Sequence, residues 1–246
     1  MSLMYSLNAL YASPVWRAQT HTRHSKRERD NLQAYDSKLL KKDAFGQVSL
    51  IHSESGPLIR RDARDAAIAL RWIARRLLAR EARALAVLEE LDGIPALIRS
   101  DKSTLDRTYV DGVPMQEGRP GHIEYFHAAA RILRRMHRLG VVHNDLAKEP
   151  NLLLTSDGRP AIVDFQLSWF VRRRGPLFRT LAREDIRHLL KHKRTYCPDR
   201  LTCREKSILA NPSMISKLWM MTGKPVYLFI TRKVLGWQDR EGAGER

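Results

Sequence analysis

The spacing of apolar and polar positions predicts strands in the first part of the chain and mostly helices in the later part. Short alternating or apolar runs predict strands at residues 47–52, 58–61, 96–99, 104–110 and 152–154. Apolar positions that recur every three or four residues predict helices at residues 66–91, 123–139, 181–193, 213–221 and 225–235. Strands, one helix, further strands and then helices are the order of an α+β protein with two sub-domains.

The two longest helical patterns carry continuous apolar stripes. In the helix at residues 66–91, the expected core-facing positions are Leu70, Ile73, Leu77, Ala84 and Leu88. In the helix at residues 123–139, they are Phe126, Ala129, Leu133 and Met136. This spacing places side chains on one side of a helix, so we expect each helix to bury that side.

Changes in composition divide the chain into four expected segments. Residues 1–38 are polar and basic, and we expect them to form a flexible extension. Residues 39–112 hold most of the predicted strands, and the run Asp111-Gly112-Val113-Pro114 interrupts the pattern as a connection between two lobes would. Residues 113–200 are expected to form a larger, mostly helical lobe, and residues 201–246 a basic helical segment.

The chain is large enough for a real core and is strongly basic. It has 246 residues, of which 43% are hydrophobic, and a formal net charge of +17. The charge indicates attraction to polyanions, for which ATP phosphates, anionic lipid headgroups, lipopolysaccharide phosphates and RNA are the candidates. Aromatic residues are not interleaved with basic clusters such as 172–174 and 187–194, so nucleic acid is the least favoured. Arginine-rich helix faces in contact with solvent would explain the charge equally well.

Membrane spans and structural metal sites are not expected. The sequence contains no run of about 18 apolar residues and no typical secretory signal, so we expect a cytoplasmic protein. The basic, apolar stretch 224–237 fits either a helix docked on the larger lobe or one lying on the inner face of an anionic membrane. Cys197 and Cys203, even with His188 and His192, lack the usual spacing of zinc ligands, so free thiols are favoured.

Three oxygen-bearing side chains form the most informative pattern in the chain. Asp145 follows the helix at 123–139, Asn151 directly precedes the strand at 152–154, and Asp164 follows an apolar run. Phosphoryl transfer from a nucleotide needs a carboxylate to orient the acceptor hydroxyl. It also needs an amide and a second carboxylate to hold metal ions, and such oxygen ligands suit Mg²⁺.

The stretch His143-Asn144-Asp145-Leu146-Ala147-Lys148-Glu149-Pro150-Asn151, followed by Val163-Asp164-Phe165-Gln166, resembles the catalytic and metal-binding loops of the protein-kinase-like superfamily. The resemblance implies a two-lobed α+β fold, with ATP and Mg²⁺ as cofactors. It also implies Asp145 as the catalytic carboxylate, and Asn151 and Asp164 as metal ligands.

Two departures from the family pattern lie in these loops. Asn151 is one residue further from Asp145 than in most kinases, so we expect the extra residue to bulge near Ala147 and Lys148. Lys148 is expected to contact the transferred phosphate, as a lysine does in many hydroxyl-directed kinases. Gln166 replaces the usual glycine, which reduces the freedom of the backbone there. His143 is expected to pack beneath the loop rather than act as a base.

The nucleotide-anchoring residues of the smaller lobe match the family less well. Within the predicted strand at 58–61, Arg60 takes the position of the anchoring lysine, and Glu81 takes that of its glutamate partner on the next helix. Arginine can bridge phosphates and a carboxylate, but it is longer and planar. The phosphate-covering loop retains only Gly46 and Val48, so fewer backbone N–H groups can approach a nucleotide closely.

The short stretch after Asp164, with no Ala-Pro-Glu motif, resembles the small bacterial branch near lipopolysaccharide (Kdo-type) kinases and RIO-like kinases. Residues 181–185 and 191–193 also look like bacterial sequences labelled serine/threonine protein kinase. We therefore expect transfer of a phosphate to protein Ser/Thr, with a lipid-linked lipopolysaccharide sugar as the alternative acceptor. A pseudokinase that binds nucleotide without turnover is a further alternative, which Arg60 and Gln166 favour. A module that only binds polyanions would leave the loops unexplained.

Overall fold

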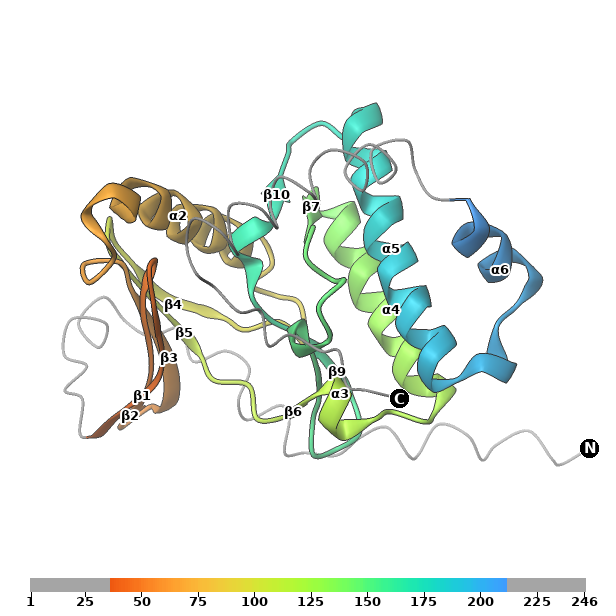
Figure 1. Ribbon diagram of the computed structural model, residues 1–246, viewed down its shortest axis with the longest axis horizontal. Helices are drawn as coiled ribbons and strands as arrows, with labels where there is room; N and C mark the ends of the chain where they lie inside the picture. Colours follow the sequence, from red (N-terminus) through yellow and green to blue (C-terminus); the bar gives the residue numbers. More distant parts are fainter. Residues whose placement is uncertain (1–35, 212–246) are drawn as a thin grey trace, which may run out of the picture.

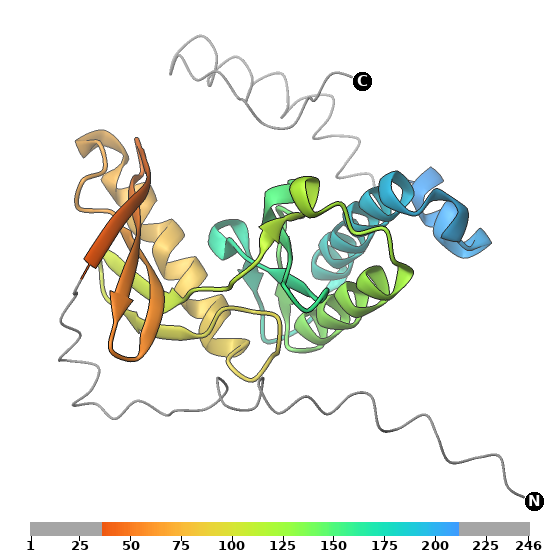
Figure 2. The same ribbon diagram turned by 90° about the horizontal axis from the view of Figure 1, so that it is seen from below.

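The computed structural model describes residues 36–211, which form a strand-rich lobe and a mostly helical lobe (Figure 1). The helices predicted at 213–221 and 225–235, and nearly all of the predicted N-terminal extension, lie outside the described residues. Viewed from below, the chain leaves the sheet after β5 and crosses to the helical lobe (Figure 2). A mixed α and β fold with a strand-rich first lobe was predicted, and it is confirmed.

The first lobe is built on an antiparallel sheet with the strand order β1-β2-β3-β5-β4. Its strands are β1 Asp36–Asp43, β2 Gly46–Ser53, β3 Gly56–Asp62, β4 Leu97–Ser100 and β5 Thr104–Thr108. The alternation of apolar and polar residues did not predict β1, because the described side chains of this strand are exposed or half-buried on both faces. Gly46 is required at the β1–β2 turn: its φ is +124°, and a Cβ there would lie 2.1 Å from the carbonyl oxygen of Asp62.

One long helix packs against this sheet. A short 3₁₀ turn, Ile68–Leu70, leads into α2, Arg71–Val87. The predicted stripe was shifted by one position at its start, because Leu70, Ile73 and Leu77 are only half-buried. The buried residues of α2 are instead Ala74, Leu78, Glu81, Ala84 and Leu85. The sequence pattern was misleading because the buried face of α2 contains a glutamate, which an apolar periodicity counts as a surface residue.

The second lobe is organised around two helices, α4 Ile123–Arg138 and α5 Pro176–Tyr196. The core-facing positions predicted for α4 are confirmed, since Phe126, Ala129, Leu133 and Met136 are all buried. The smaller elements are β6 Val113–Pro114, α3 Met115–Gly118, β7 Val141–Val142, η3 Glu149–Asn151, β8 Leu152–Leu154, β9 Pro160–Ile162, η4 Phe165–Leu167, β10 Trp169–Phe170, η5 Pro198–Arg200 and α6 Cys203–Ala210. Strand β8 pairs with β6 and β9, and β7 pairs with β10.

A cluster of buried hydrophobic side chains joins the two lobes. It includes Leu85 and Leu105 from the first lobe and Met136 and Phe165 from the second. Phe165 is fully buried and directly follows Asp164, so the loop that carries Asp164 is held against α2. Within residues 36–211, no helix has both the length and the apolar character that crossing a bilayer requires.

Candidate active site

The loop between β7 and β8 brings three of the predicted site residues into contact. The side-chain amide nitrogen of Asn151 donates to the backbone carbonyl of Asp145 at 2.9 Å and to its Oδ2 at 3.1 Å. Lys148 Nζ lies 3.4 Å from the same carboxylate oxygen. A turn at residues 146–147 and the 3₁₀ helix η3 accommodate the extra residue of this loop. Asn151, and not Pro150, therefore faces Asp145.

His143 ties this loop to the strand that leads to Asp164. It is fully buried, its Nε2 lies 3.0 Å from the carbonyl oxygen of Val163, and its ring packs edge-on against Phe165. Its Nδ1 accepts the backbone N–H of Asp145 at 3.3 Å. Both ring nitrogens are thus occupied, and the structural position expected for His143 agrees with this geometry.

A buried carboxylate on α5 holds the start of the loop, and the sequence pattern gave no sign of this contact. Asp185 accepts the backbone N–H groups of His143 at 2.8 Å and of Asn144 at 2.9 Å. His137 Nε2 lies 3.1 Å from the same side chain. Asn144 has a positive φ of 65°, a conformation that asparagine tolerates better than most residues. Asp185 therefore stabilises a backbone turn that would be unfavourable without such bonds.

Asp164 follows β9 and also has a left-handed backbone, with φ 65°. The backbone N–H of Val163 donates to the carbonyl oxygen of Asn151 at 3.0 Å, which places Asp164 next to the loop described above. Asp164 Oδ1 is buried, has no hydrogen-bond partner among residues 36–211, and lies 3.4 Å from Nη1 of Arg61. A non-glycine residue held in this conformation with an unsatisfied oxygen is typical of a functional position.

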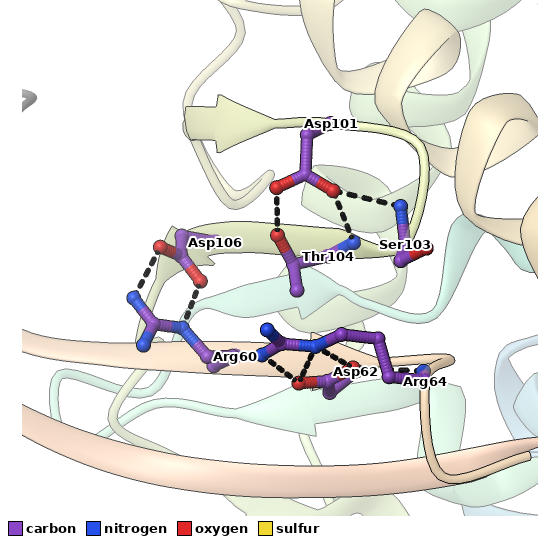
Figure 3. Close-up of polar contacts among 7 residues, drawn as sticks. All are labelled: Arg60, Asp62, Arg64, Asp101, Ser103, Thr104 and Asp106. Atoms are coloured by element: carbon purple, nitrogen blue, oxygen red, sulfur yellow. Dashed lines mark hydrogen bonds and ion pairs between the residues drawn. The ribbon is translucent and has the colours of Figure 1, made fainter.

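The arginine that reaches Glu81 is Arg61, so the expected pairing of Arg60 with Glu81 was wrong by one residue. Arg61 Nη1 donates to Glu81 Oε2 at 3.0 Å. Arg60 forms two hydrogen bonds of 2.7 Å with Asp106 on the neighbouring strand, beside Asp62 and its partner Arg64 (Figure 3). Successive residues of a strand point to opposite faces, so two adjacent arginines can only be distinguished once the position of α2 is known.

Glu81 lies between two arginines in a buried cluster of charges. Arg107 on β5, which the sequence analysis did not single out, places its Nε 3.3 Å from Glu81 Oε1. Arg61, Glu81, Arg107 and Asp164 form this cluster, which we call the charge cluster. One polar atom of each of the four residues is buried without a hydrogen-bond partner in the described part of the chain. The cluster is therefore neutral in formal charge but incompletely hydrogen-bonded.

Burial and neighbouring charges shift the pKa values of Asp145 and Asp164 in opposite directions. Burial raises the pKa of Asp145, and Lys148 only partly opposes this effect. Burial also acts to raise the pKa of Asp164, but Arg61 and other cationic neighbours outweigh it and leave the pKa below its usual value. Asp164 therefore holds its negative charge firmly, as a metal ligand does, whereas Asp145 is better suited to accept a proton.

The two remaining predicted residues lie on the strand next to Arg61. Val48 on β2 is the cross-strand partner of Arg61, so its side chain lies on the face of the sheet that carries Arg61 and the charge cluster. Gly46 packs against the backbone of Asp62, and this close approach explains the glycine without a ligand. A nucleotide contact at either position stays a prediction.

The arrangement fits a magnesium ion that is coordinated partly by protein side chains and partly by the phosphates of a nucleotide. Asp164 offers a buried oxygen without a hydrogen-bond partner within residues 36–211, and Asn151 uses its amide nitrogen on Asp145, so its side-chain oxygen is the atom that could serve as a ligand. Mg²⁺ needs only one or two protein ligands when phosphates and water complete its shell. Within the described part of the chain, no three His, Cys, Asp or Glu residues gather as a metal cage, and Cys197 and Cys203 are free thiols.

The sheet, the helix that packs on it and the two loops match the two-lobed fold of solved Rio2 kinase structures. Among solved structures, the chain is similar to the Rio2 kinase from Chaetomium thermophilum, with a TM-score of 0.53 and 16% identity over 69% of this chain and 59% of that one. It is also similar to the ADP/Mg²⁺-phosphoaspartate complex of that kinase, with a TM-score of 0.54 and 14% identity over 80% of this chain and 68% of that one. No family model matches the sequence, and no curated protein matches it.

Proposed function

We propose that the protein is an ATP- and Mg²⁺-dependent phosphotransferase that moves the γ-phosphate to a hydroxyl group. The observation that carries this proposal is the direct contact of Asn151 with Asp145, beside an ionised Asp164 whose buried oxygen has no hydrogen-bond partner. A purely structural loop would have no need for two carboxylates and an amide at one point. One of the similar structures is a kinase complex with ADP and Mg²⁺, which supports the same chemistry.

In this proposal each residue has a distinct task. Asp145 orients the acceptor hydroxyl and accepts its proton, for which a raised pKa is favourable. Asn151 and Asp164 would hold Mg²⁺, which would supply positive charge to neutralise the phosphates. Lys148, beside Asp145, would approach the transferred phosphate. Arg61 takes the place of the nucleotide-anchoring lysine, and Glu81 orients it.

The acceptor that we propose is a protein Ser/Thr hydroxyl, with a lipid-linked lipopolysaccharide sugar as the alternative. We place the protein in the cytoplasm, with contact to the inner membrane face as part of the alternative. A pseudokinase is the second candidate function, and one observation favours it. Arg61 contacts both Glu81 and Asp164, so it competes for the carboxylate that Mg²⁺ would need.

Transfer from radiolabelled ATP to a cell lysate, separated into protein and lipid fractions, tests the proposal. Asp145→Asn should preserve Mg-ATP binding and lower turnover by roughly 10²–10⁴-fold. Asp164→Asn should weaken Mg-ATP binding itself, whereas the exposed Asp199→Asn serves as a control and should change neither property. Label in the lipid fraction alone would support the sugar acceptor.

Two outcomes would contradict the proposal. Wild-type binding of Mg-ATP without transfer to any fraction would establish the pseudokinase instead. Retained turnover in Asp145→Asn would remove the assignment of that residue. Because one similar structure contains a phosphoaspartate, the protein itself is also analysed for label that hydroxylamine releases, so that a phosphorylated aspartate is not mistaken for Ser/Thr transfer.

A further inference from the structure

A groove of about 490 Å³ lies on the helical lobe between α4, residues 91–93 and the β8–β9 hairpin. Its floor is apolar, with Leu91, Pro160 and Ala161 buried and Ile132 partly buried. A concave surface of this size can hold a short segment of chain. We call this feature the basic groove, because arginines form its rim.

The rim carries an excess of positive charge. Arg131, Arg134, Arg135 and Arg138 on α4 are exposed and line the groove, and Arg159 joins them from the hairpin. Arg159 is paired with Asp157, but none of the four α4 arginines forms an ion pair with any residue in the range 36–211. Asp92 is the one carboxylate among the described lining residues. Arginines that stay unneutralised around an apolar floor favour an anionic ligand.

The basic groove is separate from the candidate active site, although both lie on the same hairpin. In the antiparallel pair of β8 and β9, Leu152 pairs with Ile162 and Leu154 pairs with Pro160. Asn151 and Asp164 therefore lie at one end of the hairpin, and the groove lies at the other. Strands of three residues are about 10 Å long, so a ligand in the groove would not overlap the nucleotide site.

We propose that the basic groove binds an acidic peptide segment of a partner protein. The α4 arginines span about 10 Å along the helix axis, which equals about three residues of an extended peptide. Carboxylates on such a segment could pair with the guanidinium groups while its apolar side chains cover Leu91 and Ile132. Among the described residues that line the groove none is aromatic, so it lacks the aromatic platform on which nucleic-acid bases stack.

The segment that binds in the groove must come from another molecule, because the terminal segments of this chain are themselves basic. Residues 1–35 and residues 212–246 each contain more Lys and Arg than Asp and Glu, so neither segment complements the arginines. A bilayer surface is broad and would touch the rim without reaching the apolar floor. An acidic peptide satisfies both the charge of the rim and the apolar character of the floor.

Fluorescence anisotropy with a labelled peptide of alternating Glu and Ala tests the proposal with the full chain at low ionic strength. Arg131→Glu with Arg135→Glu should weaken binding by about tenfold or more, because two charge-assisted contacts become repulsive. The matched control is Arg76→Glu with Arg80→Glu, which makes the same change on exposed positions of α2. Arg131→Gln with Arg135→Gln should have a smaller effect in the same direction.

Three other outcomes would each overturn the proposal. Equal weakening by the α2 control would mean that the net charge attracts the peptide without a site. Tighter binding of a single-stranded RNA probe, lost in the α4 variants, would make the groove a nucleic-acid site, and the same result with anionic vesicles would make it a membrane contact. None of these readouts depends on turnover, so a failure here leaves the proposed phosphotransferase activity unaffected.

Discussion

The loop around Asp145 and the charge cluster around Glu81 both position carboxylates, but they are held in different ways. The loop is fixed by hydrogen bonds: Asp185 accepts two backbone N–H groups, and Asn151 donates twice to Asp145. The charge cluster is held by opposite charges, and each of its four residues keeps a buried polar atom that forms no hydrogen bond with any described residue.

This difference indicates which region can change. A network with its hydrogen bonds satisfied has one favourable geometry, whereas an unsatisfied buried polar atom costs about 1–3 kcal/mol and gains from a new partner. Nucleotide phosphates and Mg²⁺ would supply such partners to Arg61 and Asp164. We therefore infer that the loop is preformed and that the charge cluster rearranges on binding. Four substitutions or conditions sharpen this comparison.

The largest effect is expected from Glu81→Gln. The substitution leaves Arg61 and Arg107 buried without their shared counter-charge, so the free energy of unfolding should fall by roughly 3–5 kcal/mol. Urea denaturation measures this change, with the exposed Glu89→Gln as the control. A loss below about 1 kcal/mol would mean that the cluster contributes little to folding and that water already screens it.

Asp185→Asn should have the next largest effect. An amide keeps one acceptor oxygen but loses the charge that both backbone N–H groups share, so we expect a loss of about 2–3 kcal/mol. Hydrogen exchange should accelerate more at the backbone amides of His143 and Asn144 than at the amides of α5. Unchanged protection at these two amides would contradict the anchoring role, even if the global stability decreased.

Lowering the pH should reduce the folding stability through His188 on α5, the helix that also carries Asp185. Burial, together with the nearby Lys191, lowers the pKa of His188 to about 4, against the attraction of Asp185 and Glu184. The unfolded chain then binds more protons between about pH 4 and 6.5, so stability is complete above this window and falls as the pH decreases through it. His188→Gln should reduce the pH-dependent loss by about 1–2 kcal/mol in denaturation experiments, after allowance for solvent screening. An unchanged pH slope would show that His188 does not titrate with folding.

Arg60→Gln should have the smallest effect. Arg60 is partly exposed and pairs with Asp106 on the face of the sheet away from Glu81. Asp106 is buried, but the amide of the introduced glutamine can still donate a hydrogen bond to it, so we expect a stability loss of about 1 kcal/mol and no change in the affinity for Mg-ATP. Arg61→Gln is the matched comparison, since it removes the neighbouring arginine that faces Glu81. A greater loss of nucleotide affinity in Arg60→Gln than in Arg61→Gln would restore the original prediction.

The sequence by itself determined the features that depend on neighbouring residues. The buried face of α4 followed from an apolar period of three to four residues, and the order of strands and helices indicated the fold class. The pattern also led to Asn151 rather than Pro150 as the partner of Asp145, because proline has no side-chain ligand atom and the following strand limits the geometry.

Only the tertiary structure decided which groups meet across the chain. Arg60 and Arg61 have the same side chain, and α2 on one face of the sheet determines which of them reaches Glu81. Asp185 is far from His143 in sequence, and Arg107 is far from Glu81, so no local pattern could connect them. Short-range periodicity reports how a segment is buried, whereas the pairing of buried charges depends on how whole elements pack, and that packing is specified by the complete fold.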